Sequence, residues 1–123
     1  MDAKAGLPNA HAAHVPPGKV SEYLLSLAHS YGASKARFFR RLGYGDETAK
    51  LLESELLQLA RDGELAGTIP GTYGTKYIVE GKIRRPGGGQ ASLTSVWLIE
   101  QGKTRPRLVT AYQRRQRQGS DDT

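Results

Sequence analysis

The stretch TKYIVEGKI, residues 75–83, decides the fold class, because its side chains alternate between two sides of the chain. Tyr77 and Val79 fall on one side, and Lys76 and Ile78 fall on the other. A two-residue period is typical of a β-strand, whereas a helix would repeat every three or four residues. We therefore expect a strand here and a sheet in this half of the chain.

Two more strands are predicted after it. ASLTSVWLIE, residues 91–100, is mostly apolar by its end and predicts a central strand, and RLVTAY, residues 107–112, predicts the last one. The connections over 84–90 and 101–106 are short and rich in turn residues, and short connections join antiparallel neighbours. Before the first strand, TIPGTYGT, residues 68–75, is expected to form turns.

The N-terminal half shows helical spacing instead. We expect helices over about 20–28, 34–42 and 46–62, and in the last of these Leu52 and Leu56 belong to an apolar stripe. The predicted fold class is α+β, with three N-terminal helices packed on a small three- to four-stranded antiparallel sheet.

The composition divides the chain into three parts. Residues 1–18 consist mainly of small residues, proline and glycine, which predicts a flexible leader. Residues 19–113 are expected to form a single α+β domain. Residues 114–123, rich in arginine and glutamine, are expected to be a flexible tail.

Charge indicates the class of partner. The 123-residue chain has a formal net charge of +6, which favours polyanions, with nucleic acid the commonest and an anionic membrane the alternative. Part of this charge lies in the C-terminal run QRRQRQGS, which can equally be a solvated tail. No apolar run approaches the ~20 residues that span a bilayer, and no secretion signal is recognised, so we expect no membrane contact. The expected compartment is the cytoplasm, reached directly or by delivery through a larger secretion system or phage.

Metal and cofactor chemistry finds little support in the sequence. The chain has no cysteine, which excludes disulfides and thiolate ligands. Its carboxylates are not clustered as two-metal chemistry requires, and His29 is the single histidine of the predicted domain. We therefore expect no metal and no cofactor.

A lysine on an apolar helix face is the first candidate for a site. Lys35 falls on the same face as Phe38, Phe39 and Leu42, a few residues after His29. Such a lysine can extend its amine to solvent, pair with a buried acid, or border a cleft that needs a cation. At a helix N-terminus near an imidazole, the cleft would suit a phosphate.

The strands supply further candidates. Thr110 and Tyr112 project to one face of the last strand, where their hydroxyl groups can donate to a phosphate or simply edge a core. Basic and aromatic side chains elsewhere on the strands and at the hairpins can contact nucleic-acid phosphates or bases. These RNA-binding candidates are Lys76, Tyr77, Arg84 and Arg107.

Four segments carry a resemblance to known families: SKARFF, GTKYIVEG, VWLIEQG and PRLVTAY. Together they resemble an uncharacterised bacterial and phage domain family over about residues 19–112. The order of helices before sheet, with a final Thr-Ala-Tyr element, is also similar to the metal-independent RNases of the barnase–EndoU–colicin–RelE superfamily, many of which are toxins. That resemblance implies RNA cleavage by transphosphorylation, with side chains on the sheet and on a preceding helix.

On this hypothesis the candidate catalytic residues have distinct roles. His29 acts as general base or acid, Lys35 stabilises the phosphorane, and Thr110 with Tyr112 orients the phosphate. The implied partners are RNA and a cognate immunity or antitoxin protein. Two alternatives stay open: a non-catalytic nucleic-acid-binding or phage adaptor module, and an immunity-type domain that binds another protein through its sheet. The sequence does not determine the oligomeric state.

Overall fold

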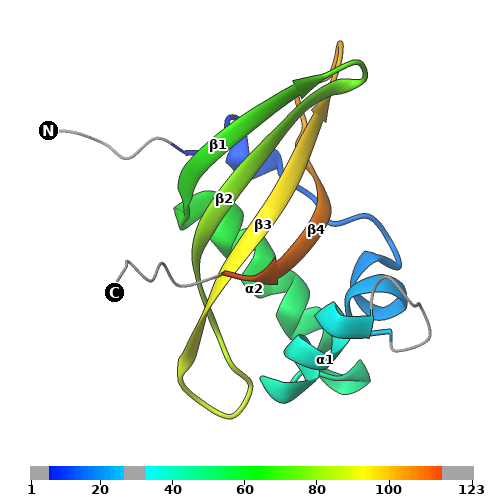
Figure 1. The fold of residues 1–123 in the computed structure, drawn as a ribbon, viewed down its shortest axis with the longest axis vertical. Coiled ribbons are helices and arrows are strands. Elements are labelled where there is room, and N and C mark those ends of the chain that lie inside the picture. Colours follow the sequence, from blue (N-terminus) through cyan, green and yellow to red (C-terminus); the bar gives the residue numbers. More distant parts are fainter. Residues whose placement is uncertain (1–5, 27–32, 115–123) are drawn as a thin grey trace, which may run out of the picture.

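The computed structural model describes residues 6–26 and 33–114 of the chain and shows helices packed against an antiparallel sheet (Figure 1). The helical elements of the described residues are the short turns η1 (Ala10–Ala12), η2 (Lys19–Leu24) and η3 (Asp46–Thr48), and the helices α1 (Ala33–Arg41) and α2 (Ala49–Asp62). The strands are β1 (Glu64–Gly71), β2 (Gly74–Arg84), β3 (Gln90–Glu100) and β4 (Arg107–Gln113). The α+β class is therefore confirmed.

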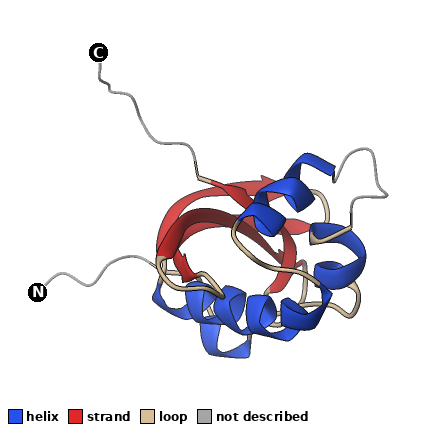
Figure 2. Ribbon diagram, turned by 90° about the horizontal axis from the view of Figure 1, so that it is seen from below, coloured by secondary structure: helices blue, strands red, loops and turns tan. Residues whose placement is uncertain are grey.

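The sheet of the described chain is a four-stranded meander in the order β1-β2-β3-β4, and every pairing is antiparallel. It curves as a layer partly enclosed by helices (Figure 2). The register between β2 and β3 places Tyr77 opposite Trp97 and Val79 opposite Ser95, so these four side chains share one face. We call it the inner face.

Helix α2 covers the inner face with the stripe that the sequence predicted. Leu52, Leu56 and Leu59 are buried, and they belong to one core cluster with Val79 and Trp97. At its end, α2 approaches β2 very closely. A Cβ added to Gly63, the residue after α2, would lie 2.7 Å from the Leu59 carbonyl oxygen and 2.9 Å from the Glu80 carbonyl oxygen, so glycine is required where the helix meets the strand.

Strand β1 corrects the expectation that residues 68–75 form only turns. Gly71 pairs with Gly74 around a two-residue connection, and Gly74 has a φ of 149°, which only glycine adopts readily. Pro70 is tolerated because β1 is an edge strand, where one missing N–H donor leaves no partner unsatisfied. With β1 included, the sheet has four strands, the upper number of the three to four that the sequence predicted.

The expectation of three helices packed on the sheet also needs correction. Within the described residues the helix expected from residue 20 is the six-residue turn η2, a π-helix, and the expected helix over 46–62 is η3 followed by α2. Leu24 and Leu25, at the end of η2, are both fully buried and anchor this short element in the core.

Residues 6–18 form a strap across the domain, which differs from the expected flexible leader. Leu7 is buried in the core. The His14 backbone N–H donates to the Pro106 carbonyl, and the Leu108 N–H donates to the His14 carbonyl, both at 3.0 Å. The Arg105 Nε also donates to the Ala12 carbonyl at 2.8 Å. The strap therefore pairs with the start of β4.

A buried carboxylate joins α2 to the hairpin between β2 and β3. Glu55 of α2 is 5% exposed and accepts hydrogen bonds from the Arg84 backbone N–H at 2.8 Å and the Arg84 Nε at 3.0 Å. The Tyr44 hydroxyl donates to the Arg84 carbonyl. Burial, and then the nearby Glu55 charge, raise the pKa of Tyr44 to about 12 despite the opposing Arg84 charge.

Replacing Glu55 with alanine should destabilise the fold strongly, because the Arg84 backbone N–H would lose its acceptor and a cavity would form. We expect a loss of about 2–3 kcal/mol in the free energy of unfolding, measured by urea denaturation. Glu53→Ala on the same helix is the matched control and should cost under about 0.5 kcal/mol. Equal losses in the two variants would contradict the fastening role of Glu55.

Acid should weaken the strap through His14. Partial burial, followed by the charges of Arg105 and Arg107, lowers the pKa of His14 below its usual value of 6.5. A lowered pKa means that the unfolded chain binds the proton more readily, so the contribution of His14 is full above pH 6.5 and is lost as pH falls through the folded-state pKa. His14→Gln should flatten the decrease in melting temperature between about pH 8 and pH 5, whereas His11→Gln at an exposed position of the strap should not. Identical pH profiles for the wild type and the His14 variant would refute this.

Candidate functional site

The face of the sheet opposite α2, which we call the outer face, carries the side chains that alternate with the core positions. The register sets Ile78 opposite Val96, Glu80 opposite Thr94, and Thr94 opposite Tyr112. Five adjacent positions on three strands therefore project together. Here the outer face is bordered by α1, which lies beyond β4 (Figure 1).

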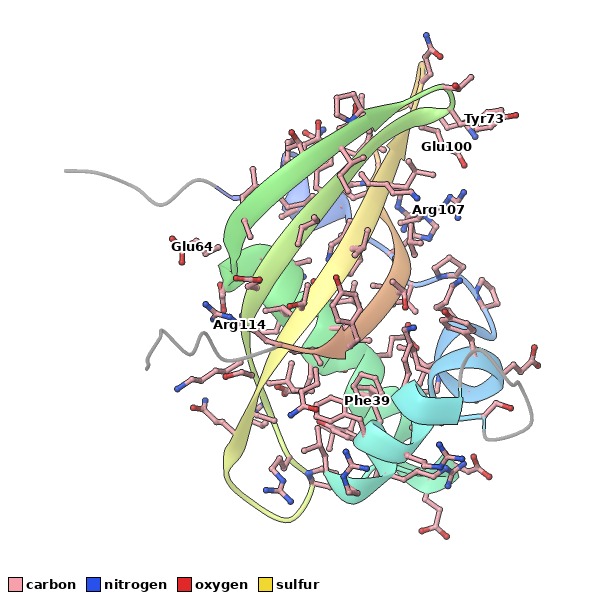
Figure 3. All side chains as sticks on the ribbon, in the orientation of Figure 1. Phe39, Glu64, Tyr73, Glu100, Arg107 and Arg114 are labelled. Carbon is pink, nitrogen blue, oxygen red and sulfur yellow. The ribbon has the colours of Figure 1, made fainter. Side chains whose placement is uncertain are left out.

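A groove of about 920 Å³ runs between α1 and the outer face. Figure 3 shows the side chains of α1 and of the neighbouring strands in this region. One wall consists of α1 residues, the floor comes from β1, β2 and β3, and the end of β4 lies between them. The groove is lined by Lys35, Arg37, Phe38, Arg41, Ala66, Ile78, Glu80, Thr94, Tyr112 and Gln113.

Helix α1 is held in this orientation by its two other sides. Ala36 and Phe39 are fully buried, and the Phe39 ring contacts the Phe38 ring edge-to-face at 5.1 Å between centroids. The Arg40 guanidinium donates to the Leu25 carbonyl at 3.0 and 2.7 Å, which joins α1 to the end of η2. The remaining side of the helix faces the sheet and forms the groove wall.

Lys35 and Tyr112 meet in the groove. The Lys35 Nζ lies 6.0 Å from the centroid of the Tyr112 ring, at the outer limit of a cation–π contact, and Tyr112 is 37% exposed. Within residues 6–26 and 33–114, no carboxylate pairs with Lys35. Of the three alternatives for this lysine, its position is that of a cation bordering a cleft.

The groove is cationic on its helix side. Lys35, Arg37 and Arg41 contribute three positive charges, whereas Glu80 is the single acid among the lining residues that the structure describes. The Glu80 carboxylate is itself 3.4 Å from the Arg114 guanidinium. Because clefts lined by one sign of charge concentrate the opposite ion, the groove is suited to an anionic ligand.

The predicted catalytic residues are only partly brought together. Lys35 and Tyr112 line the groove, but Thr110 does not. The Thr110 Oγ1 is buried without a hydrogen-bond partner among the described residues, and Thr94 supplies the hydroxyl beside Tyr112 instead. His29 lies outside the described residues, so its role stays a prediction.

The predicted RNA-binding residues are dispersed. Lys76 lies on the outer face, as Ile78 does, but does not line the groove. Tyr77 belongs to the inner face, where it packs against the core. Arg84 is paired with Glu55, and the Arg107 Nε donates to the Glu100 carboxylate at 3.0 Å. The pairings of Arg84 and Arg107 give both guanidinium groups a structural partner. Figure 3 shows Arg107 near Glu100, well away from α1.

The sequence analysis singled out only Lys35 and Tyr112 among the groove residues, and four of those it missed are instructive: Arg37, Arg41, Glu80 and Thr94. Arg37 and Arg41 are four positions apart on α1, a spacing that signals a shared helix side. Glu80 and Thr94 follow the strand alternation, but their pairing across β2 and β3 depends on a register that is not encoded locally. The helix positions could have been found from the sequence, whereas the cross-strand pair could not.

No metal-binding cluster or membrane-spanning helix occurs in the described residues. Groups of three or more His, Cys, Asp or Glu side chains placed to hold a metal ion are absent from this part of the chain. None of its helices combines the length and apolarity needed to cross a bilayer.

Comparisons with known proteins identify a family and a fold. A family model described as a domain of unknown function, DUF6883, matches residues 6–115. No curated protein matches the chain. The structure is similar to a chain of the contact-dependent growth inhibition toxin–immunity protein complex from Klebsiella pneumoniae 342, with a TM-score of 0.67 and 17% identity, over 87% of this chain and 97% of that chain. At this identity the likeness concerns the fold alone.

Polyanion affinity should depend on the groove rather than on net charge. Lys35→Ala and Arg41→Ala each remove one positive charge from the groove wall and should lower the salt concentration that elutes the protein from heparin. Lys103→Ala removes the same charge from the β3–β4 turn, where Lys103 is 2.9 Å from Glu100, and should elute close to the wild type. Equal shifts for all three variants would show that the groove has no special role.

Proposed function

The chain belongs to the DUF6883 family, and we propose that it is a metal-independent ribonuclease-type toxin domain that cleaves RNA by transphosphorylation in the groove. The likeness to a chain from a toxin–immunity protein complex supports a toxin-related role. The groove supports a phosphate-directed one, because cations line it beside a tyrosine hydroxyl. Delivery into a target cell and neutralisation by an immunity protein belong to the same proposal.

The proposed reaction needs no external reagent. The 2′-oxygen of the RNA forms a bond to the adjacent phosphorus, the bond from phosphorus to the 5′-oxygen breaks, and a 2′,3′-cyclic phosphate remains. One proton leaves the 2′-hydroxyl and one joins the 5′-oxygen, so an acid and a base are required. Each properly placed acid or base contributes about 10²–10⁴-fold to the rate.

The groove residues divide these tasks. The Lys35 ammonium and the Arg41 guanidinium stabilise the extra negative charge of the phosphorane. The Tyr112 and Thr94 hydroxyls donate to its oxygens, a role that the resemblance assigned to Tyr112 with Thr110. His29 is the predicted group for proton transfer, and the Glu80 carboxylate is a described groove group that can accept the 2′ proton.

One observation carries the proposal: an ammonium group without a carboxylate partner among the described residues lies over a half-exposed tyrosine in a groove with two arginines. A lysine that only extended into solvent would need no groove, and a lysine that paired with a buried acid would be neutralised. The arrangement leaves its charge available to a ligand.

RNA cleavage in EDTA is the direct test. The wild type should degrade RNA, and Lys35→Ala should reduce the rate by about 10²–10³-fold because a charge on the transition state loses its partner. Lys103→Ala should retain full activity, and circular dichroism should show that both variants are folded. Glu80→Gln and His29→Ala, compared separately, identify the group that moves the proton.

The alternatives give different outcomes. Salt-sensitive RNA binding without cleavage would replace the nuclease by a binding module. Tight binding to another protein, with no RNA affinity, would favour the immunity-type role. Full cleavage by Lys35→Ala would refute the proposed site.

A further inference from the structure

Part of the groove floor is apolar. Ile78 and Ala66 form this part, and Phe38 of α1 also lines the groove. Gly67 pairs with Ile78 across β1 and β2, and the Ile78 Cδ1 lies 3.8 Å from the position that a Gly67 Cβ would occupy. The isoleucine side chain therefore spreads over a strand with no side chain of its own at that point. We call Ile78, Ala66 and the bare backbone of Gly67 the floor platform; Gly67 is not itself a lining residue of the groove but pairs with Ile78, which is.

The positive charges lie to one side of the floor platform, and the Glu80 carboxylate on β2 also lines the groove. Lys35, Arg37 and Arg41 project from α1, whereas Ile78 and Ala66 belong to the strands. An anionic backbone held along the helix wall thus has an apolar surface next to it, with Tyr112 between the two. This arrangement, a cationic track beside apolar and aromatic surfaces, is the one on which proteins bind single-stranded nucleic acid.

We infer that the groove takes an unpaired segment of RNA, with a base lying face-down on the floor platform while the phosphates follow the α1 wall. The inference rests on the proposed function and adds to it the class of substrate. It also assigns Ile78 and Gly67 to substrate binding, although neither carries a reactive group.

Only an unpaired base can make this contact. In a double helix the faces of the bases are covered by their neighbours, and duplex RNA exposes base edges, hydroxyl groups and phosphates. The floor platform has no hydrogen-bonding side chain to meet such edges, whereas it fits the face of a ring. The groove volume of about 920 Å³ is in the range of small-ligand sites.

Contact through base faces also predicts what the site will discriminate. A purine covers more apolar surface than a pyrimidine, so purines should bind somewhat more tightly. Because every base has a face, the preference should be graded and not absolute.

The first variant, Gly67→Leu, adds a side chain at the floor platform and removes no existing contact. Gly67 has ordinary extended backbone, and a Cβ there would meet Ile78 at a normal van der Waals distance, so Gly67→Leu should fold. The added side chain would occupy the space of the base. Ile78→Ser is the second variant, because it removes the apolar surface. Ile69→Ser is the matched control, since Ile69 is 51% exposed, belongs to the same face and does not line the groove.

The measurement is fluorescence anisotropy with a short unstructured oligonucleotide that is 2′-O-methylated, so that it binds but lacks the nucleophile. The same sequence annealed into a duplex is the comparison. The wild type should prefer the single strand by at least about tenfold, and Gly67→Leu and Ile78→Ser should each weaken single-strand binding by about tenfold. Ile69→Ser should bind as the wild type does, and duplex binding should be unchanged in all variants.

Equal affinity for single strand and duplex, or wild-type binding by the folded Gly67→Leu variant, would overturn the inference. The experiments distinguish a failure of this inference from a failure of the proposed function. RNA cleavage that depends on Lys35 but not on Gly67 or Ile78 would leave the nuclease in place without the floor platform. Binding that depends on Gly67 and Ile78 without any cleavage would keep the floor platform and remove the nuclease.

Discussion

The pairing of β2 with β3 is the constraint on which the other features depend. The Trp97 indole N–H donates to the Ser95 hydroxyl at 2.8 Å, and that hydroxyl donates to the Val79 carbonyl at 3.0 Å, all within the buried inner face. A shift by one residue would move Trp97 to solvent and break this chain of hydrogen bonds. It would also turn Thr94, which lies on β3 as Trp97 does, away from the groove. The core contacts and the groove floor are therefore two consequences of one register.

Much of the fold could be predicted from the sequence, because local periods report which side of a strand or helix is buried. The alternation in residues 75–83 gave the correct faces of β2, and the stripe with Leu52 and Leu56 gave α2. The strap and β1 could not be predicted in this way. Leu7 is one apolar residue among small ones, and Pro70 suggests a turn, so in both cases distant partners decide the structure.

The candidate site was predictable to the same degree. Lys35 stood out because it interrupts an apolar helix face, and it does reach a groove that Tyr112 also lines. Thr110 lies on the same face of β4 as Tyr112, two residues away. The alternation along a strand does not tell whether a hydroxyl is covered by neighbouring side chains, and the Thr110 Oγ1 is buried. The roles of Arg41 and Glu80 depend on how α1 is placed against the sheet, which no local pattern encodes.

The two edge strands of the sheet, β1 and β4, are protected in different ways, and this has a consequence for association between copies of the chain. The start of β4 is capped by the strap through His14, while β1 presents an irregular pairing after Leu65 and a proline at position 70. Neither border offers an uninterrupted ladder of backbone donors to a second molecule. These features disfavour the addition of a strand from a second copy to either edge of the described sheet, so growth of the sheet by stacking of copies is opposed at both ends.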